Sequence, residues 1–320
     1  MLALKWTPDQ LYRVPTADGA AIGLGRYLPR REPRHATPVV LCHGLGANRF
    51  DLDFNERYSL AQFLARKGFE TWVLELRGRG TAGKAIDTTF DEQAEHDVEA
   101  ALSTVLSTGA TQVFWVGHSK GALVAYAHLA KKPSAPIRAL VALGTPVSFD
   151  THSGLQPFLK LVMPALRLGV IPLRLATRPA ALWGLPPPPL GSYLANPDNM
   201  DAMVMRQAIY NVSADIAGGV ARQFARWVKT GAFDADDGFD YRANMKHITV
   251  PALLIAGVED RLAPPSAVKR AAASLGGEVV YRELSRAEGF RADYGHGDLT
   301  LGRHAPEEVF PLVAEFLSTH

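Results

Sequence analysis

The sequence predicts an α/β protein: a mostly parallel, doubly wound sheet with a helical cap inserted after a strand that ends near residue 147. Two observations support this prediction. Apolar, β-rich runs alternate with helical segments from residue 37 to residue 147, and again from residue 248 onwards. Between these regions, residues 148–246 contain no clear strand and many prolines, four of them consecutive at 186–189. We therefore expect a sheet domain formed by residues 1–147 and 247–320, and a cap formed by residues 148–246.

The elements of the sheet domain can be placed in chain order. Residues 11–29 alternate between apolar and polar around Asp18-Gly19, which indicates a hairpin. Gly68 and Gly109 end two segments that carry helical signals. The expected strands are 37–41, 71–76, 113–116, 137–143, 248–257 and 278–284, and the expected helices are 60–67, 91–107, the segment after Ser119, 266–275 and 306–317.

Composition favours a globular protein with a large core. Apolar residues make up 47% of the 320 residues, and charged residues make up 21%. The net charge is +2 and no dense block of Lys or Arg occurs, so nucleic-acid binding is not expected. The single cysteine, Cys42, lies in an apolar run, which indicates a small core residue rather than a reactive thiol.

The sequence also carries information on the compartment. Residues 1–10 lack the basic region, apolar stretch and small-residue cleavage site of a signal peptide. No window holds about 18 uninterrupted apolar residues, so no membrane-spanning helix is expected. A single cysteine is compatible with a reducing environment. These observations predict a soluble protein of the cytoplasm.

A serine lies at a sharp turn predicted between a strand and a helix. The apolar run that ends at Val116 leads into Gly117-His118-Ser119-Lys120-Gly121, and an Ala- and Leu-rich helical segment follows. A nucleophile elbow has this order, because its strained central residue tolerates only small residues two positions before and after it. The helix that follows would direct its first amides at negative charge formed there. We therefore interpret Ser119 as a nucleophile.

A serine nucleophile needs a base and a carboxylate that orients the base. In an open α/β sheet, functional residues gather beyond the carboxyl ends of the strands. Asp260 follows the strand that ends at Gly257, and His296 lies between two glycines after the last strand. We therefore expect Asp260 and His296 to complete a triad with Ser119.

Other side chains compete for these roles. Glu259 is the close rival of Asp260, and Asp298 could orient His296 from nearby. His118 is adjacent to the serine, and because neighbouring side chains diverge we interpret it as structural. His43 opens a glycine-rich loop, where a local hydrogen bond is the expected role.

An acyl intermediate also needs two backbone donors for its oxyanion. The expected donors are the amide of Lys120, directly after the nucleophile, and the amide of Leu45 in the loop after strand 37–41. Gly44 and Gly46 would let that loop approach a substrate closely. The ten histidines show no metal-binding spacing, and no glycine pattern indicates a dinucleotide site, so neither a metal nor a cofactor is expected.

The motifs HGLG at 43–46, RGRG at 77–80 and GHSKG at 117–121 resemble those of α/β-hydrolases of the lipase and esterase branch. The resemblance covers roughly residues 37–147 and 248–318, and the insertion corresponds to the family's variable cap. It implies that Ser119 attacks an ester carbonyl, that His296 transfers the proton and that Asp260 orients His296. Lys120 departs from the pattern, since a cation opposes the dipole at a helix N-terminus, and we expect it to pair with an acidic group.

The cap suggests the kind of substrate. Lys160, Arg167 and Arg174 recur every seven residues in an apolar stretch that prolines would divide into short helices. This pattern favours a cap whose apolar side packs over the sheet domain, and the alternative is a lid that also makes weak contact with a lipid surface. Either arrangement favours esters with a hydrophobic acyl or alcohol part. Apolar residues at 200–228 are expected in the core rather than in a substrate-binding wall.

The sequence thus predicts a cofactor-independent serine hydrolase of carboxylic esters. The same triad could instead transfer the acyl group to another acceptor or hydrolyse a carbon–carbon bond. A third alternative, a non-catalytic binder of a small hydrophobic ligand, has no need for a complete triad. The oligomeric state is not predicted.

Overall fold

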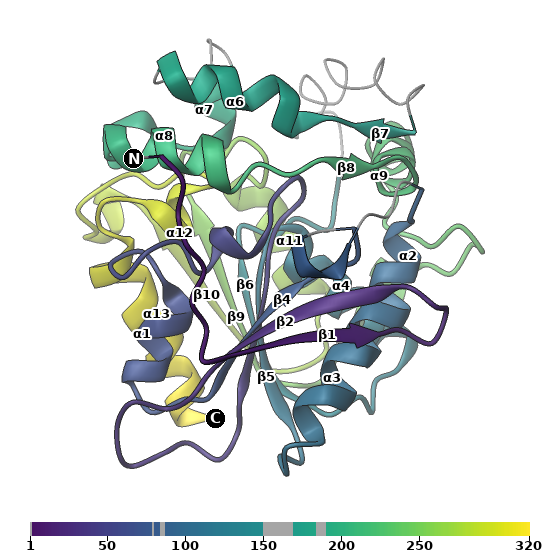
Figure 1. The fold of residues 1–320 in the computed structure, drawn as a ribbon. Coiled ribbons are helices and arrows are strands. Elements are labelled where there is room, and N and C mark those ends of the chain that lie inside the picture. Colours follow the sequence, from purple (N-terminus) through teal and green to yellow (C-terminus); the bar gives the residue numbers. More distant parts are fainter. Residues whose placement is uncertain (1, 79, 84–86, 150–168, 184–189) are drawn as a thin grey trace.

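The structure is a computed structural model that describes residues 2–78, 80–83, 87–149, 169–183 and 190–320. In these ranges, eight strands form one sheet in the order β1-β2-β4-β3-β5-β6-β9-β10 (Figure 1). Strands β1 and β2 pair antiparallel at one edge, and the pairs from β4 to β10 are all parallel. The strands are β1 (Gln10–Pro15), β2 (Ala21–Tyr27), β3 (Val39–Cys42), β4 (Thr71–Glu75), β5 (Val113–His118), β6 (Ile137–Leu143), β9 (Ala252–Gly257) and β10 (Val279–Leu284). The predicted fold class is confirmed.

Helices cover both faces of the sheet. Alternate residues of each strand point to opposite faces, so Val39 and Leu41 pack under α1 and α13, whereas Val40 and Cys42 pack with α3 and α4. The helices are α1 (Leu60–Arg66), α2 (Phe90–Glu92), α3 (Val98–Leu106), α4 (Lys120–Lys131), α6 (Leu173–Trp183), α7 (Leu190–Leu194), α8 (Ala202–Asn211), α9 (Gly218–Thr230), α10 (Tyr241–Asn244), α11 (Pro265–Ser274), α12 (Asp298–Leu301) and α13 (Ala305–Thr319). In the described ranges, no helix is long and apolar enough to cross a membrane.

The helix expected over 91–107 is interrupted. A wide turn of π-helix, η3 (Gln93–Asp97), lies between α2 and α3. Two of its side chains are buried and polar, and both have partners on other elements: Gln93 accepts a hydrogen bond from Lys120 Nζ of α4, and Asp97 pairs with Arg77, which follows β4. Helical periodicity cannot predict this interruption, because the polar partners lie far away in the sequence.

Helices α6, α7 and α8, from the segment between β6 and β9, lie over the edge of the sheet where the parallel strands end, uppermost in Figure 1. The described residues of this segment, 169–183 and 190–246, are referred to below as the cap. Its described part also contains a short antiparallel ladder between β7 (Val170–Ile171) and β8 (Ile216–Ala217). The expectation of no strand in this region was therefore wrong, because a two-residue pairing is too short to show alternation. Of the three basic residues at sevenfold spacing, Lys160 and Arg167 lie outside the described residues.

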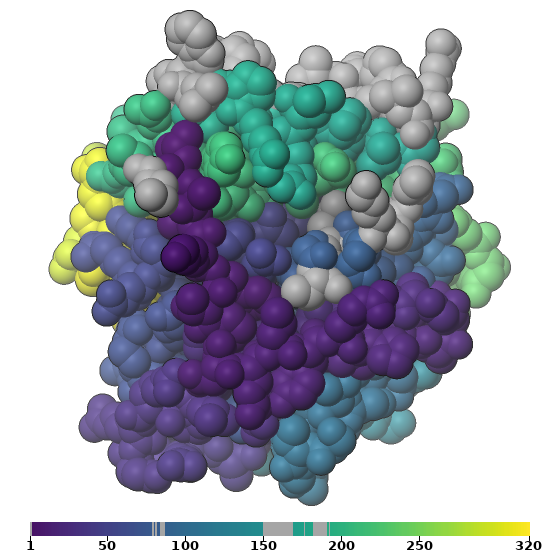
Figure 2. Space-filling model, in the orientation of Figure 1, coloured from purple at the N-terminus to yellow at the C-terminus, as the bar shows by residue number. Residues whose placement is uncertain are grey.

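The N-terminal segment ties the cap to the sheet domain. It runs up beside α8, as the purple atoms in Figure 2 show. The amide of Leu4 donates to Asn211 Oδ1 at 3.0 Å, and Asn211 Nδ2 donates to the carbonyl of Leu2 at 2.7 Å. Trp6 Nε1 donates to Asp53 Oδ2 at 2.7 Å, in the sheet domain. One extended segment therefore contacts both parts of the molecule.

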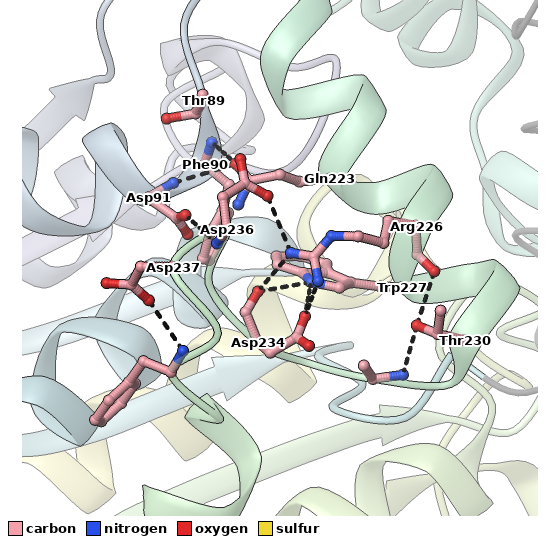
Figure 3. A network of polar contacts seen from close by, with 12 residues as sticks. Thr89, Phe90, Asp91, Gln223, Arg226, Trp227, Thr230, Asp234, Asp236 and Asp237 are labelled. Atoms are coloured by element: carbon pink, nitrogen blue, oxygen red, sulfur yellow. Dashed lines mark hydrogen bonds and ion pairs between the residues drawn. The ribbon is translucent and has the colours of Figure 1, made fainter.

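Helix α9 is anchored to the sheet domain by a polar network (Figure 3). Gln223 Oε1 accepts a hydrogen bond at 2.6 Å from the amide of Phe90, the first residue of α2. A side chain of α9 thus satisfies a free amide at the N-terminus of α2. Arg226 pairs with Asp234 and lies 3.1 Å from Asp236 Oδ1. The amide of Asp236 in turn donates to Asp91 Oδ2 at 2.8 Å. These bonds connect α9, the segment after it and α2.

Trp227 is the centre of an aromatic cluster beside this network. Its ring lies 4.9 Å from those of Phe90 and Phe224 and 5.1 Å from that of Phe233, and the side chain is fully buried. We expect Trp227→Ala to lower the free energy of unfolding by about 3–5 kcal/mol, because it leaves a cavity among rings that cannot collapse into it. Denaturant unfolding measures this value, and a loss below about 1 kcal/mol would contradict tight packing at this site.

Candidate active site

Ser119 occupies the turn between β5 and α4. Its φ of +51° is the only positive value at a non-glycine residue in the described ranges. A side chain at Gly117 would collide with the backbone of Ala122, and one at Gly121 would collide with the carbonyl of Cys42. Both glycines are therefore required by packing. The strained conformation, held by the bond from the Ser119 amide to the Leu143 carbonyl at 2.8 Å, is typical of functional sites.

His296 and Asp260 form a buried pair beside this turn. Asp260 Oδ2 lies 2.8 Å from His296 Nδ1, and the side chains are 0% and 9% exposed. Asp260 Oδ1 accepts the amides of Leu262 and Ala263 at 2.9 and 2.7 Å, which fixes the carboxylate. The rival Glu259 is exposed. With Nδ1 bound to Asp260, His296 has Nε2 left for proton transfer in the pocket that it lines together with Ser119.

Asp298 does not bind the ring of His296. Its two oxygens accept the amide of Gly295 at 2.9 Å, and it also accepts the amide of Asn196 at 3.0 Å and Asn199 Nδ2 at 2.9 Å. Burial raises the pKa of this carboxyl group, although these hydrogen bonds act in the opposite direction. Asp298 therefore connects the loop that carries His296 to the cap.

The glycine-rich loop after β3 approaches the serine closely. A Cβ atom at Gly44 would lie 3.4 Å from the Cβ of Ser119. The amide of Gly44 donates to Asp51 Oδ2 at 2.9 Å, and Leu45, the next residue, lines the same pocket as Ser119. His43 Nδ1 lies 2.9 Å from the carbonyl of Gly44, a local contact as expected. Leu45 therefore shares the pocket with Ser119, and Lys120 directly follows Ser119 as the first residue of α4.

The side chain of Lys120 is buried behind the turn. Its Nζ donates to Gln93 Oε1 at 2.7 Å, which is a contact with a neutral amide. Asp97 is also affected by its charge. Burial raises the pKa of Asp97 to about 6, although Arg77 and Lys120 act in the opposite direction. Asp97 is thus an acidic group whose pKa the charge of Lys120 affects.

Cys42 lies on β3, close to the elbow, but it is a core residue. The side chain is fully buried, and burial raises the pKa of its thiol to about 12. A thiol with a raised pKa carries little thiolate at neutral pH and is a poor nucleophile. Cys42 therefore packs the core, as its apolar run predicts.

Ser119 and His296 open into one apolar pocket of about 180 Å³. Its wall includes six apolar residues of 200–228: Met200, Met205, Ala208, Ile209, Val212 and Phe224. The expectation that these positions are core rather than wall is therefore right only in part, because Ile209 and Phe224 are buried in the core and also line the pocket. Trp227 is fully buried in the aromatic cluster and does not line the pocket. The lining comprises Gly44, Leu45, Gly46, Ala47, Asp51, His118, Ser119, Leu123, Pro146, Phe149, Leu194, Ala195, Met200, Met205, Ala208, Ile209, Val212, Ser213, Phe224, Leu262, His296, Gly297 and Leu301.

Asp51 is the pocket residue that sequence reasoning missed. It lies in a short 3₁₀ helix, η1 (Arg49–Asp51), and is 4% exposed. Its Oδ2 is 2.8 Å from His118 Nδ1, so the structural role inferred for His118 includes a buried carboxylate partner. Asp51 follows the HGLG motif at 43–46 closely in the sequence, but no known spacing pattern would have identified it as a site residue. In the described ranges, no group of three or more His, Cys, Asp or Glu could hold a metal ion.

A parallel sheet with a strained serine turn and a histidine–carboxylate pair at one edge defines the class of α/β-hydrolase-like proteins. A sequence model described as the alpha/beta hydrolase fold matches residues 37–299, and the chain belongs to this family.

Two curated human relatives agree with this assignment. Lipase member K is 24% identical over 95% of this chain and 86% of its own length. Lysosomal acid lipase/cholesteryl ester hydrolase is 31% identical over 43% of this chain, and the match spans only 39% of that protein. Among solved structures, a thermophilic esterase from Thermogutta terrifontis has a TM-score of 0.66 at 19% identity, covering 97% of this chain and 98% of its own. The chain is thus a lipase- and esterase-like member of the family.

Proposed function

We propose that this protein is a serine hydrolase that cleaves carboxylic esters with a hydrophobic acyl or alcohol part through an acyl-enzyme. One observation carries the proposal. Ser119 and His296 line the same apolar pocket, and Asp260 Oδ2 is hydrogen-bonded to His296 Nδ1, which leaves Nε2 of the ring to accept a proton. A serine, a base and an orienting carboxylate are the groups that this chemistry needs.

The reaction would follow from these positions. Ser119 Oγ attacks the ester carbonyl, and His296 Nε2 takes the serine proton while Asp260 stabilises the imidazolium that forms. The amides of Leu45 and Lys120 would bind the oxyanion. His296 then protonates the leaving alcohol, and water activated by the same ring releases the acid and restores Ser119.

The pocket supports a neutral, apolar substrate. Its described lining contains no Lys, Arg or Glu, and its one carboxylate, Asp51, is paired with His118. The volume of about 180 Å³ is similar to that of the ~150 Å³ apolar cavities that hold benzene. An acyl or alcohol part of about six carbons should therefore fit. The names of the relatives, lipase and cholesteryl ester hydrolase, agree with ester substrates.

The first test combines covalent labelling with a substrate series. A fluorophosphonate should label Ser119, and p-nitrophenyl esters of graded acyl length should be hydrolysed best at about four to eight carbons. Labelling with no ester turnover would favour acyl transfer or carbon–carbon bond hydrolysis on the same residues. No labelling would favour the non-catalytic binder.

The cap wall offers a test of the pocket itself. Ile209 of α8 lines the pocket, whereas Val204 of the same helix is buried but does not. We expect Ile209→Ala, which removes three carbons from the wall, to move the preferred acyl length upward by about two carbons. Val204→Ala serves as the matched control, because it leaves the wall unchanged. An equal shift in both variants would contradict the assignment of this pocket to the acyl chain.

Two further properties are part of the proposal. Leu175 of α6 is 77% exposed beside Arg174, which supports weak contact of the cap with a lipid surface. A vesicle-binding assay comparing wild type with Leu175→Ser tests the lipid contact.

The single, buried Cys42 is compatible with a reducing compartment, so the proposed location is the cytoplasm.

A further inference from the structure

A second histidine–carboxylate pair lies beside Ser119. His118 Nδ1 is 2.8 Å from Asp51 Oδ2, and both side chains are 5% exposed. The ring of His118 lies against that of His296, with centroids 4.7 Å apart. No step of the proposed reaction uses either residue, although both line the substrate pocket. Their role is therefore a separate question.

The contacts of the His118 ring define its protonation state. Its Nδ1 faces the Asp51 carboxylate, and its Nε2 faces the carbonyl of His296 at 3.2 Å. A carbonyl oxygen and an ionised carboxylate only accept hydrogen bonds, and a neutral imidazole has only one N–H to donate. Both contacts are satisfied only if the ring carries two protons. With Asp51 ionised, the geometry is the one expected for an imidazolium paired with a carboxylate.

The electrostatic surroundings agree with this charge state. Burial lowers the pKa of His118, but the charge and hydrogen bond of Asp51, together with the charge of Asp260 and the carbonyl of His296, outweigh burial and raise it. Burial likewise raises the pKa of Asp51, but His118 and the Gly44 amide outweigh burial and lower it. The other titratable groups that face the pair are His296, Asp260 and His43.

The pair connects the three segments that carry the proposed chemistry. Asp51 holds the amide of Gly44, directly before the proposed oxyanion donor Leu45, and lies 3.4 Å from Thr300 Oγ1 of α12. His118 directly precedes Ser119 and binds the carbonyl of His296. The ion pair thus touches the oxyanion loop, the elbow and the histidine loop, which are far apart in the sequence.

We propose that His118 is held as an imidazolium by Asp51, and that this ion pair fixes the oxyanion loop and the main chain of His296 relative to Ser119. Both are positioning residues for the hydrolysis proposed above, on which this inference rests. A buried ion pair seldom adds net stability compared with apolar side chains of the same volume, so stability alone does not account for it. Misplacing reacting groups by about 1 Å costs about 10²-fold in rate, which is the effect that the pair would prevent.

The test uses His118→Gln, Asp51→Asn and the double variant. Each single change should lower kcat for a short p-nitrophenyl ester about 10²-fold with little change in KM. Because the residues act as one unit, the double variant should lose no more than the poorer single variant. In His118→Gln, the cation beside His296 is lost, so protonation of His296 becomes easier. The fall of kcat/KM on the acid side of its pH profile should therefore begin at a higher pH than in the wild type.

His128→Gln is the matched control. His128 lies on α4, is 3% exposed and has Nδ1 2.9 Å from the carbonyl of Ala94, but it does not touch the pocket. This variant should lose stability without a change in kcat or in the acid limb. The inference is overturned if His118→Gln behaves like His128→Gln at a temperature where both are folded, or if the losses of the two single variants add.

A measurement on the wild-type protein separates this inference from the proposed function. The ring ¹⁵N and ¹H resonances of His118 should show two N–H groups at neutral pH, and they can be read whether or not the protein turns over an ester. A neutral tautomer at pH 7 would overturn the inference even in an active enzyme. Two N–H groups in a protein that cleaves no ester would support the ion pair while the proposed function failed.

Discussion

Ser119→Ala is expected to lower kcat for p-nitrophenyl esters by about 10⁴–10⁶-fold, because it removes the only group proposed to form the acyl-enzyme. The substitution removes a single oxygen atom and keeps Cβ, so the strain at a φ of +51° is the same in both proteins. The pocket wall is unchanged, and substrate affinity should therefore be retained. The free energy of unfolding should change by less than about 0.5 kcal/mol.

The control for this prediction is a buried serine elsewhere in the chain, Ser285. Ser285 caps a short helix, accepting the amide of Glu288 at 3.2 Å, and is not in the pocket. Ser285→Ala should lose some stability and keep its turnover per folded molecule. Steady-state kinetics and binding of an uncleaved ester analogue are measured for both variants. Full turnover by Ser119→Ala would exclude the acyl-enzyme, and loss of analogue binding along with turnover would indicate a disturbed pocket.

The sequence predicted those parts of the site that depend on local backbone constraints. Gly117 and Gly121 flank Ser119 because larger residues would collide with neighbouring backbone, and this constraint is visible as a spacing in the chain. Asp260 and His296 were found by a rule of topology, since each follows a strand of a parallel sheet. The strand periodicity predicted the sheet for a similar reason: burial on both faces selects apolar runs.

The parts that were missed depend on contacts between distant segments. Asp51 and His118 are 67 residues apart, and no local pattern marks a carboxylate in a short 3₁₀ helix as the partner of a histidine on a strand. The same is true of Gln93, which a turn of π-helix brings to Lys120. Ile209 could be recognised as apolar, but whether it faces the core or a pocket depends on where α8 lies over the sheet. The packing of the cap determines which way Ile209 faces, and the helix propensity of the sequence does not.

Asp260→Asn is expected to lower kcat by about 10⁴-fold through a change of tautomer. Asp260 Oδ1 accepts two backbone amides, so an asparagine would keep its carbonyl oxygen there and turn its NH₂ group toward His296 Nδ1. Nδ1 would then have to accept a hydrogen bond, which places the ring proton on Nε2. A ring protonated on Nε2 cannot take the proton of Ser119, although every heavy atom is nearly in place.

This mechanism predicts more than a loss of rate. The kcat of Asp260→Asn should rise with pH above the range in which the wild type reaches its plateau, because only loss of a further proton can supply a base. Glu259→Gln, a matched change of carboxylate to amide at the exposed neighbouring residue, should keep the wild-type profile. If instead Glu259→Gln lost activity and Asp260→Asn retained it, the orienting carboxylate would be Glu259. Since the Oδ1 bonds to Leu262 and Ala263 can form with an asparagine oxygen as well, the loss in Asp260→Asn should appear in kcat and not in folding.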